Sequence, residues 1–223
     1  MESFNEQLAT KVDHYIEHLL NPQDEALIQN LKNAQAADLP TINVSPNEGK
    51  LLYLLAKMAG ARRVLEIGTL GGYSTTWLAR ALPADGKVIT LELDEKHAAV
   101  ARSNLARAGV ADRVEVRVGR ALETMRRMFD QHEAPFDLIF IDADKPSYME
   151  YLDLSLQLSH AGTVILADNL IRNGRVLDAH PSDEAARGAQ AFNNALAANQ
   201  HLESIILPII RANLDGLSIS IVK

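Results

Sequence analysis

Three oxygen-bearing side chains stand close to the ends of two short apolar runs. Asp142 follows the run Leu138–Ile141, and Asp168 and Asn169 follow the run Thr163–Leu166 closely. If these runs are neighbouring parallel strands, their carboxyl ends meet at one edge of the sheet and bring the three side chains together. Two carboxylates and an amide suit a hard divalent cation, Mg²⁺ or alternatively Ca²⁺ or Mn²⁺. Helix capping is the other interpretation of each residue taken alone.

A glycine-rich segment earlier in the chain could approach a ligand closely. It runs from Glu66 to Ser74 and contains Gly68, Gly71 and Gly72. Glycine lets the backbone turn sharply and pass next to a ligand. The segment is not the dinucleotide pattern G-x-G-x-x-G, because a leucine replaces the second glycine. Glu66 would repel a pyrophosphate and attract a cation, and a plain strand-to-helix turn is the alternative.

Two further segments could hold a nucleoside beside these glycines. Glu92 ends the next apolar run, where a carboxylate can accept hydrogen bonds from the ribose hydroxyls. Gly119-Arg120-Ala121 ends the run after that and allows the close approach that an adenine needs. The sequence has an acidic residue placed to bind a ribose but no glycine pattern that would bind phosphates. This combination indicates a nucleoside that carries positive charge. S-adenosylmethionine is the expected ligand.

These residues can share one site only if the elements between them form a sheet. From Arg63 onward, short β-rich runs alternate with helical stretches, which predicts right-handed crossovers and a parallel sheet covered on both faces. The link Ile209–Gly216 is too short for a crossover helix, so the last two strands should form an antiparallel hairpin. The expected strands are Val64–Ile67, Val88–Leu91, Val114–Val116, Leu138–Ile141, Thr163–Leu166, Ser204–Pro208 and Leu217–Val222. The expected helices among them are Ser74–Leu82, Glu95–Ala108, Ala121–Asp130, Pro146–Leu158 and Glu184–Asn199.

Three more helices are expected before the first strand. Phe4–Leu20 has apolar residues at helical spacing, Asp24–Ala37 follows it, and Ser45–Gly60 begins with an N-cap serine, a first-turn proline and a glutamate. We expect one domain over residues 1–223, with a helical N-terminal extension over 1–60 and a cofactor-binding sheet core over 61–223. The predicted fold class is α/β: a Rossmann-like, seven-stranded, mostly parallel sheet with helices on both faces and an antiparallel C-terminal hairpin.

Composition excludes several kinds of chemistry. The chain has 223 residues and no cysteine, which excludes disulfides, thiolate metal sites and cysteine nucleophiles. A net charge of −7 argues against a protein held on nucleic acid by phosphate attraction alone. The acidic N-terminus lacks signal-peptide features, and no run reaches the ~20 apolar residues of a membrane helix. We therefore expect a cytoplasmic protein with no membrane partner.

Taken together and in order, these motifs resemble a known family. It is the class I, S-adenosylmethionine-dependent and cation-dependent O-methyltransferases, which include caffeoyl-CoA and catechol O-methyltransferases. The segment Asp142-Ala143-Asp144-Lys145 looks like the caffeoyl-CoA and bacterial branch. The resemblance covers about Ser45 to Gly174, and the segments that carry it are Ser45–Gly49, Leu65–Ser74, Phe136–Lys145 and Leu166–Asn169.

The resemblance implies a role for each matching residue. Asp142, Asp168 and Asn169 would bind the metal, and Lys145 would act as the general base, with Asp142 also counted as catalytic. Around the cofactor, the methionine part would contact Glu66, Gly68 and Ser74. Glu92 would hold the ribose, and Arg120 and Ala121 would border the adenine. The expected cofactor-binding residues are Val44, Glu66, Gly68, Ser74, Glu92, Arg120, Ala121 and Asp142. At Val44, which would lie over the methionine part, the family often has threonine.

The expected reaction transfers a methyl group from S-adenosylmethionine to a cation-bound hydroxyl of a small catechol-like or hydroxycinnamoyl acceptor. The alternative acceptor is a hydroxylated wobble uridine in tRNA. A nicotinamide-dependent oxidoreductase is disfavoured by Glu66 and by the missing glycine, and the cluster around Lys145 disfavours a non-catalytic binding protein. The family is often dimeric, so we expect a homodimer in which the first 40 or so residues help to form the interface or the acceptor pocket.

One other motif could bind a metal. His14 and His18 match the pattern H-x-x-E-H of inverted zinc peptidases and share one face of the first expected helix. That face lies opposite the apolar stripe, and no assigned third ligand follows. We therefore interpret both as surface histidines.

Overall fold

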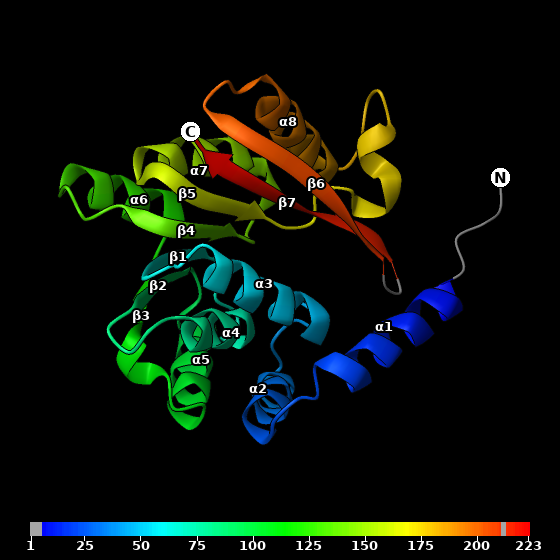
Figure 1. Ribbon diagram of the computed structural model, residues 1–223. Coiled ribbons are helices and arrows are strands. Elements are labelled where there is room, and N and C mark those ends of the chain that lie inside the picture. Colours follow the sequence, from blue (N-terminus) through cyan, green and yellow to red (C-terminus); the bar gives the residue numbers. More distant parts are fainter. Residues whose placement is uncertain (1–5, 211–212) are drawn as a thin grey trace.

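The strands form one seven-stranded sheet in the order β3-β2-β1-β4-β5-β7-β6 (Figure 1). In this computed structural model, which describes residues 6–210 and 213–223, β1 to β5 pair in parallel. β7 is antiparallel to both β5 and β6. The mostly parallel sheet and the C-terminal hairpin are thus confirmed. The strands are β1 (Arg63–Ile67), β2 (Lys87–Glu92), β3 (Val114–Val118), β4 (Phe136–Ile141), β5 (Ser159–Ala167), β6 (Leu202–Ile210) and β7 (Leu214–Val222).

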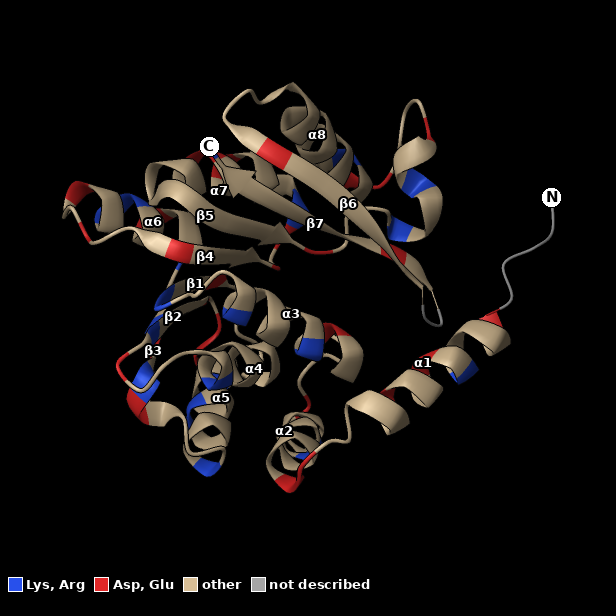
Figure 2. Cartoon of the chain, viewed as in Figure 1, with Lys and Arg blue, Asp and Glu red and all other residues tan. Residues whose placement is uncertain are grey.

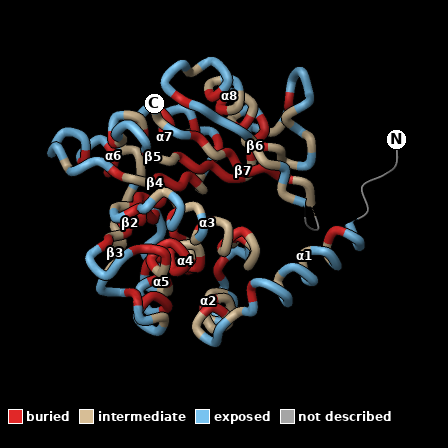
Figure 3. Tube along the Cα trace, in the orientation of Figure 1, coloured by how far each residue is buried: buried red, intermediate tan, exposed pale blue. Residues whose placement is uncertain are grey.

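Helices cover both faces of the sheet because side chains of each strand alternate between two separate cores. Leu65 and Ile67 of β1 pack with residues of α6, α7 and α8, whereas Val64 packs with residues of α2, α3, α4 and α5. Figure 3 shows the buried residues concentrated in the central strands and in α4, whereas β3 and β6 are mostly intermediate or exposed. The helices are α1 (Glu6–Leu20), α2 (Glu25–Ala36), α3 (Pro46–Met58), α4 (Tyr73–Ala81), α5 (Glu95–Arg107), α6 (Ala121–Asp130), α7 (Tyr148–Gln157) and α8 (Glu184–Ala198). Within the described residues, three 3₁₀ helices join them: η1 (Ala111–Arg113), η2 (Lys145–Ser147) and η3 (Arg172–Leu177).

Several expected boundaries differ from the observed ones. The last two strands run over Leu202–Ile210 and Leu214–Val222, beyond the expected Ser204–Pro208 and Leu217–Val222. The fifth strand begins at Ser159 instead of Thr163, because Ser159 pairs with Phe136 across a register shift that places extra residues of β5 before Val164. The helix expected over Pro146–Leu158 is split into η2 and α7. Pro146 at the start of this segment cannot donate a backbone hydrogen bond. Phe4, the expected start of the first helix, lies outside the described residues, as do residues 211 and 212 of the hairpin link.

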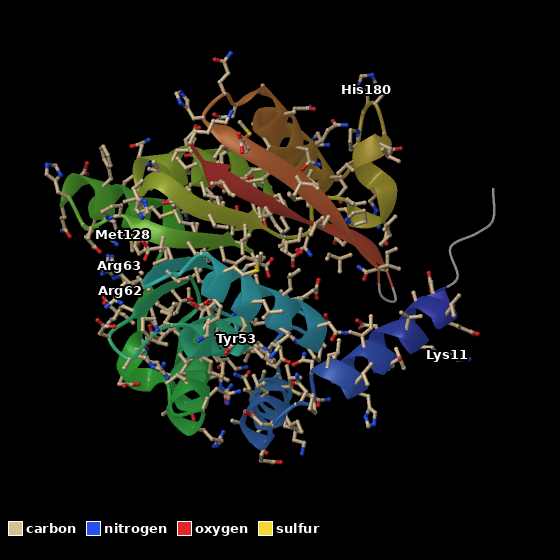
Figure 4. All side chains as sticks on the ribbon, viewed as in Figure 1. Lys11, Tyr53, Arg62, Arg63, Met128 and His180 are labelled. Carbon is tan, nitrogen blue, oxygen red and sulfur yellow. The ribbon has the colours of Figure 1, made fainter. Side chains whose placement is uncertain are left out.

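Helix α1 is set apart from the rest of the chain (Figure 1). Ala9 is its one buried residue. The helix is tied to the start of α3 by Asn47, whose side-chain amide donates to the carbonyl and carboxylate oxygens of Asp13 at 2.9 and 2.6 Å. Lys11 extends from it into open space (Figure 4). Among the described residues, none of the helices combines the length and the apolar character needed to cross a bilayer.

Candidate active site

A cavity of about 830 Å³ opens at the carboxyl ends of the parallel strands. Crossovers run outward from β1 through β2 to β3 in one direction and from β4 through β5 in the other. β1 and β4 are therefore the neighbouring strands at which the strand order reverses. The chain segments that follow their carboxyl ends run in opposite directions, so a crevice opens between them. Figure 2 shows few charged residues along β4, β5 and β7, so the charges of the site come mainly from residues that follow strand ends.

The glycine turn after β1 is fixed by its contact with the end of β4. Gly68 has a φ of 102°, and a Cβ atom there would lie 2.1 Å from the carbonyl oxygen of Asp142. Its backbone N–H donates to the carbonyl oxygen of Leu91 at 3.0 Å. Gly72, the N-cap of α4, has a φ of 78°. Only glycine fits at Gly68, because both the conformation and the space exclude a side chain.

Glu66 lies behind the cavity wall and not in it. The side chain is fully buried on the α4 side of the sheet, where it accepts hydrogen bonds from the hydroxyls of Ser74 at 2.6 Å, Thr90 at 2.7 Å and Thr75. Burial raises the pKa of this carboxyl group from 4.5 to about 7. Ser74 lines the cavity, so in this structure Glu66 orients Ser74. A direct contact between Glu66 and the cofactor stays a prediction.

Glu92 lines the cavity at the end of β2 and holds the glycine turn from the other side. Its Oε2 accepts from the backbone N–H groups of Leu70 at 2.7 Å and Thr69 at 3.2 Å. Its Oε1 accepts from the N–H of Asp94 at 3.0 Å and lies 3.5 Å from Nδ1 of His97. The predicted ribose acid is therefore positioned in the wall by main-chain donors.

Lys145 is buried between two oxygen atoms at the end of β4. Its Nζ donates to Oδ1 of Asp142 at 3.2 Å and to the hydroxyl of Tyr148 at 2.7 Å. The Tyr148 hydroxyl also lies 3.1 Å from the carbonyl oxygens of Ile141 and Asp168. Burial raises the pKa of Tyr148 well above its usual value, so the phenol keeps its proton and accepts from Lys145. Tyr148 thus anchors the ammonium group in the wall.

Asp168 and Asn169 follow β5 beside this lysine. Burial raises the pKa of Asp168 well above its usual value, and the negative charges of Asp142 and Glu48 add to the shift. Its Oδ1 accepts from the backbone N–H of Asn169 at 2.7 Å. The Asn169 amide nitrogen donates to Oδ2 of Asp215 at 3.3 Å, which leaves the amide oxygen for a ligand.

This donor set fits a divalent cation. Within the described ranges, no three His, Cys, Asp or Glu side chains are grouped to hold a metal. The predicted set instead combines the carboxylates of Asp142 and Asp168 with the amide oxygen of Asn169. Bringing a buried carboxylate next to a second one is unfavourable unless a positive charge neutralises them, and Lys145 supplies one such charge. Oxygen donors of this kind are those that Mg²⁺ and Ca²⁺ take.

The cavity wall includes all the predicted site residues except Glu66 and Asp168, which are buried behind it. Val44 lies on the side formed by the segment after α2, and Arg120 and Ala121 follow β3. The Arg120 side chain is largely exposed and lies 3.6 Å from Glu123. His14 and His18 are exposed on α1, away from the cavity, as expected. The individual roles implied by the resemblance stay predictions.

Several site residues were missed by reasoning from strand ends. Asn30, Leu31 and Ala34 of α2 line the cavity, but nothing in a helical pattern marks which residues face a ligand. Arg172 lines it from the loop after β5. Asp215 is buried behind that loop, and its Oδ1 accepts from the backbone N–H groups of Ile171 at 3.1 Å and Arg172 at 3.0 Å. Asp215 is the second residue of β7, and the apolar pattern of that hairpin strand gave no signal of this contact.

The sheet order and the cavity at its switch point define a nucleoside-binding α/β protein. Residues 18–220 match the O-methyltransferase family, and the chain belongs to that family of S-adenosylmethionine-dependent enzymes. It is 48% identical to a catechol O-methyltransferase of Niastella koreensis, over 98% of this chain and 100% of the relative.

Solved structures of similar proteins contain the expected cofactor or its product. An O-methyltransferase from Bacillus cereus in complex with SAH is 44% identical and superposes with a TM-score of 0.96, covering 98% of this chain and 100% of the other. TomG from Streptomyces achromogenes, an O-methyltransferase involved in tomaymycin synthesis and solved in complex with SAM, is 40% identical with a TM-score of 0.94. The match covers 99% of this chain and 100% of that one. The expectation of S-adenosylmethionine as cofactor is therefore supported.

Proposed function

We propose that this enzyme methylates one hydroxyl of a small vicinal diphenol with the help of a divalent cation. The observation that carries the proposal is the buried Lys145, held by Asp142 next to Asp168 and Asn169, at the cavity that the glycine turn borders. A cofactor-binding protein without catalysis needs neither a buried amine nor two neighbouring carboxylates. The name catechol O-methyltransferase of the Niastella koreensis relative supports the same acceptor class.

The residues Asp142, Asp168 and Asn169 would hold the cation through their side-chain oxygens. When bound there, Mg²⁺ would lower the pKa of a phenol, which is near 10, and fix the orientation of the vicinal oxygens. Asp215 contributes by keeping the amide nitrogen of Asn169 turned away from that position. Asp168 is held in place by the backbone N–H of Asn169.

Lys145 would take the proton of the acceptor hydroxyl when its amine is neutral. The acceptor oxygen then attacks the methyl carbon of S-adenosylmethionine, the new O–C bond forms as the S–C bond breaks, and S-adenosylhomocysteine leaves. Gly68 lets the backbone approach the cofactor, and the wall residues hold the two reactants in line. Such positioning can lower the barrier by as much as about 7–11 kcal/mol.

A methyl-transfer assay with two acceptor panels tests this proposal. We expect S-adenosylhomocysteine to form with diphenols and Mg²⁺, and formation to stop with EDTA. Activity on undermodified tRNA alone would favour the alternative acceptor, a hydroxylated wobble uridine. The basic pair Arg62 and Arg63 gives that alternative no support. Both lie at the amino-terminal end of β1 (Figure 4), and they pair with Asp85 and Glu133 respectively.

We also propose that the enzyme is a homodimer whose interface includes α1. Leu8, Val12, Ile16 and Leu19 recur at helical spacing on this helix, yet their exposed fractions lie between 40 and 59%. Water contact with a whole apolar stripe is unfavourable, and a second copy of the same stripe would cover it. A cytoplasmic location remains a prediction from the cysteine-free, acidic sequence.

A further inference from the structure

Arg172 lines the cavity, three residues after Asn169. Its backbone is held in the left-handed region, at a φ of 51°, by the hydrogen bond from its N–H to Asp215. Three residues span at most about 11 Å of chain. The backbone of Arg172 therefore lies within about 11 Å of Asn169, at the end of the cavity that the proposed function assigns to the acceptor. The reaction as proposed above gives this side chain no role.

The guanidinium group of Arg172 has donors to spare. Its Nη2 lies 3.5 Å from Oδ2 of Asp183, and the same oxygen lies 3.3 Å from Nη1 of Arg175. The other oxygen of Asp183 caps α8 by accepting from the N–H of Ala185 at 3.0 Å. The Nε of Arg172 is buried and has no hydrogen-bond partner among the described residues. One long contact to a shared oxygen thus leaves much of the hydrogen-bonding capacity of a five-donor group unused.

Other cationic side chains that line the described part of the cavity are engaged or placed elsewhere. Lys145 is held by Asp142 and Tyr148. Arg120 follows β3, at the predicted adenine end, and reaches toward Glu123. His97 lies beside Glu92. At the acceptor end, Arg172 is therefore the cation best placed to meet an anionic group of a ligand.

We infer that Arg172 binds the carboxylate of an aromatic acid, so that the preferred acceptors are dihydroxybenzoates and dihydroxycinnamates. This inference rests on the proposed function. When the two hydroxyls of such an acid lie against Asp142 and Asn169, its carboxylate points across the ring, away from the acidic cluster that would repel it. A guanidinium group matches a carboxylate with two parallel hydrogen bonds, and the partly buried wall strengthens that pairing.

Matched acceptors and matched variants test this inference. The acceptors are 3,4-dihydroxybenzoate and its methyl ester, which differ in charge and share the diphenol. The measured quantity is the ratio of kcat/KM for the acid to kcat/KM for the ester, with S-adenosylmethionine and Mg²⁺ saturating. We expect the wild type to favour the acid by about tenfold or more, and Arg172→Gln to bring the ratio close to one. Arg175→Gln, which removes the other partner of Asp183, should keep the wild-type ratio.

The outcomes separate this inference from the proposed function. A wild type that methylates both acceptors equally, or an Arg172→Gln variant that keeps the preference, overturns the role of Arg172 and leaves the proposed function standing. A wild type that methylates neither acceptor nor catechol overturns both. S-adenosylhomocysteine binding by calorimetry checks that Arg172→Gln is folded. If it is not, Arg172→Lys, which keeps the charge and loses the paired geometry, should show a reduced ratio.

Discussion

Lys145 is the residue on which the proposed chemistry depends most directly. Replacing it with methionine keeps the length of the side chain and removes the amine. We expect kcat for methyl transfer to fall by about 10²–10⁴-fold, the range typical of a lost general base. The measurement is S-adenosylhomocysteine formation at saturating acceptor and Mg²⁺. Lys11→Met, on the exposed face of α1, is the matched control, and a Lys145→Met enzyme as fast as this control would remove Lys145 as the base.

Glu66 makes the stability of the ligand-free protein depend on pH. Its pKa is about 7 when folded and 4.5 without the fold, so the folded state favours the protonated acid. The protonated Glu66 side chain therefore contributes to the free energy of unfolding. This contribution is fully present below pH 4.5 and is lost as the pH rises through 7. The glutamine of Glu66→Gln cannot titrate. The free energy of unfolding of the variant minus that of the wild type should therefore be roughly 2–3 kcal/mol larger at pH 8 than at pH 5.

Urea unfolding of both proteins at the two pH values, without cofactor, measures this gain. The comparison cancels the titration of all other groups, which the two proteins share. Any constant cost of placing an amide among three hydroxyls cancels as well. A difference between the two proteins that stays the same from pH 5 to pH 8 would show that the carboxyl group is already ionised when folded at pH 5.

Single residues at strand ends could be predicted from the sequence, and residues that act across the fold could not. Asp142 and Asn169 follow apolar runs, and parallel strands place such residues at one edge whatever their exact length. Arg172 and Asp215 belong to a loop and to a hairpin strand that meet only after folding. Their sequence separation leaves no periodic signal, so their contact had to come from the structure.

At the scale of elements, the glycine turn joins the ends of β1 and β4 tightly at the wall of the cavity. A methyl group at Gly68 would overlap the backbone of Asp142, and the φ of 102° is unfavourable for alanine. We expect Gly68→Ala to lose more than about 2 kcal/mol of stability and to weaken S-adenosylhomocysteine binding. Thermal unfolding and calorimetric titration measure the two effects.

Gly109→Ala separates the cost of the conformation from the cost of the overlap. Gly109 follows α5 with a φ of 69°, and no atom lies within 4 Å of its would-be Cβ. Its replacement should cost about 1 kcal/mol and leave ligand binding unchanged. If Gly68→Ala behaved like Gly109→Ala in both measurements, the contact between β1 and β4 would not shape the site.

The elements themselves followed from patterns that depend on local chemistry. The capping box predicted from Ser45 and Glu48 is present at the start of α3. The strand boundaries were less accurate where pairing overrides local preference, as at Ser159, whose place in β5 depends on Phe136 of the neighbouring strand. Such pairing across the sheet cannot be read from one segment alone.

At the scale of the whole molecule, the proposed homodimer predicts what the apolar face of α1 does in solution. Val12 and Ile16 lie one helical turn apart on that face, and both are at least 40% exposed within one chain. Introducing Val12→Glu and Ile16→Glu together should therefore cost a single chain little and place two like charges in the interface. We expect the wild type to have twice the 24.5 kDa mass of one chain and the double variant to have that of one chain.

The opposite face of the same helix offers the matched control. His14 and His18 have the same spacing as Val12 and Ile16, and both are exposed. Introducing His14→Glu and His18→Glu adds the same two acids to α1 without touching the stripe, so this protein should remain a dimer. Light scattering after gel filtration measures all three masses, and S-adenosylhomocysteine binding confirms that each variant is folded. A wild type with the mass of one chain would mean that α1 does not form the interface. The same would follow if the variant with Val12→Glu and Ile16→Glu kept the mass of two chains.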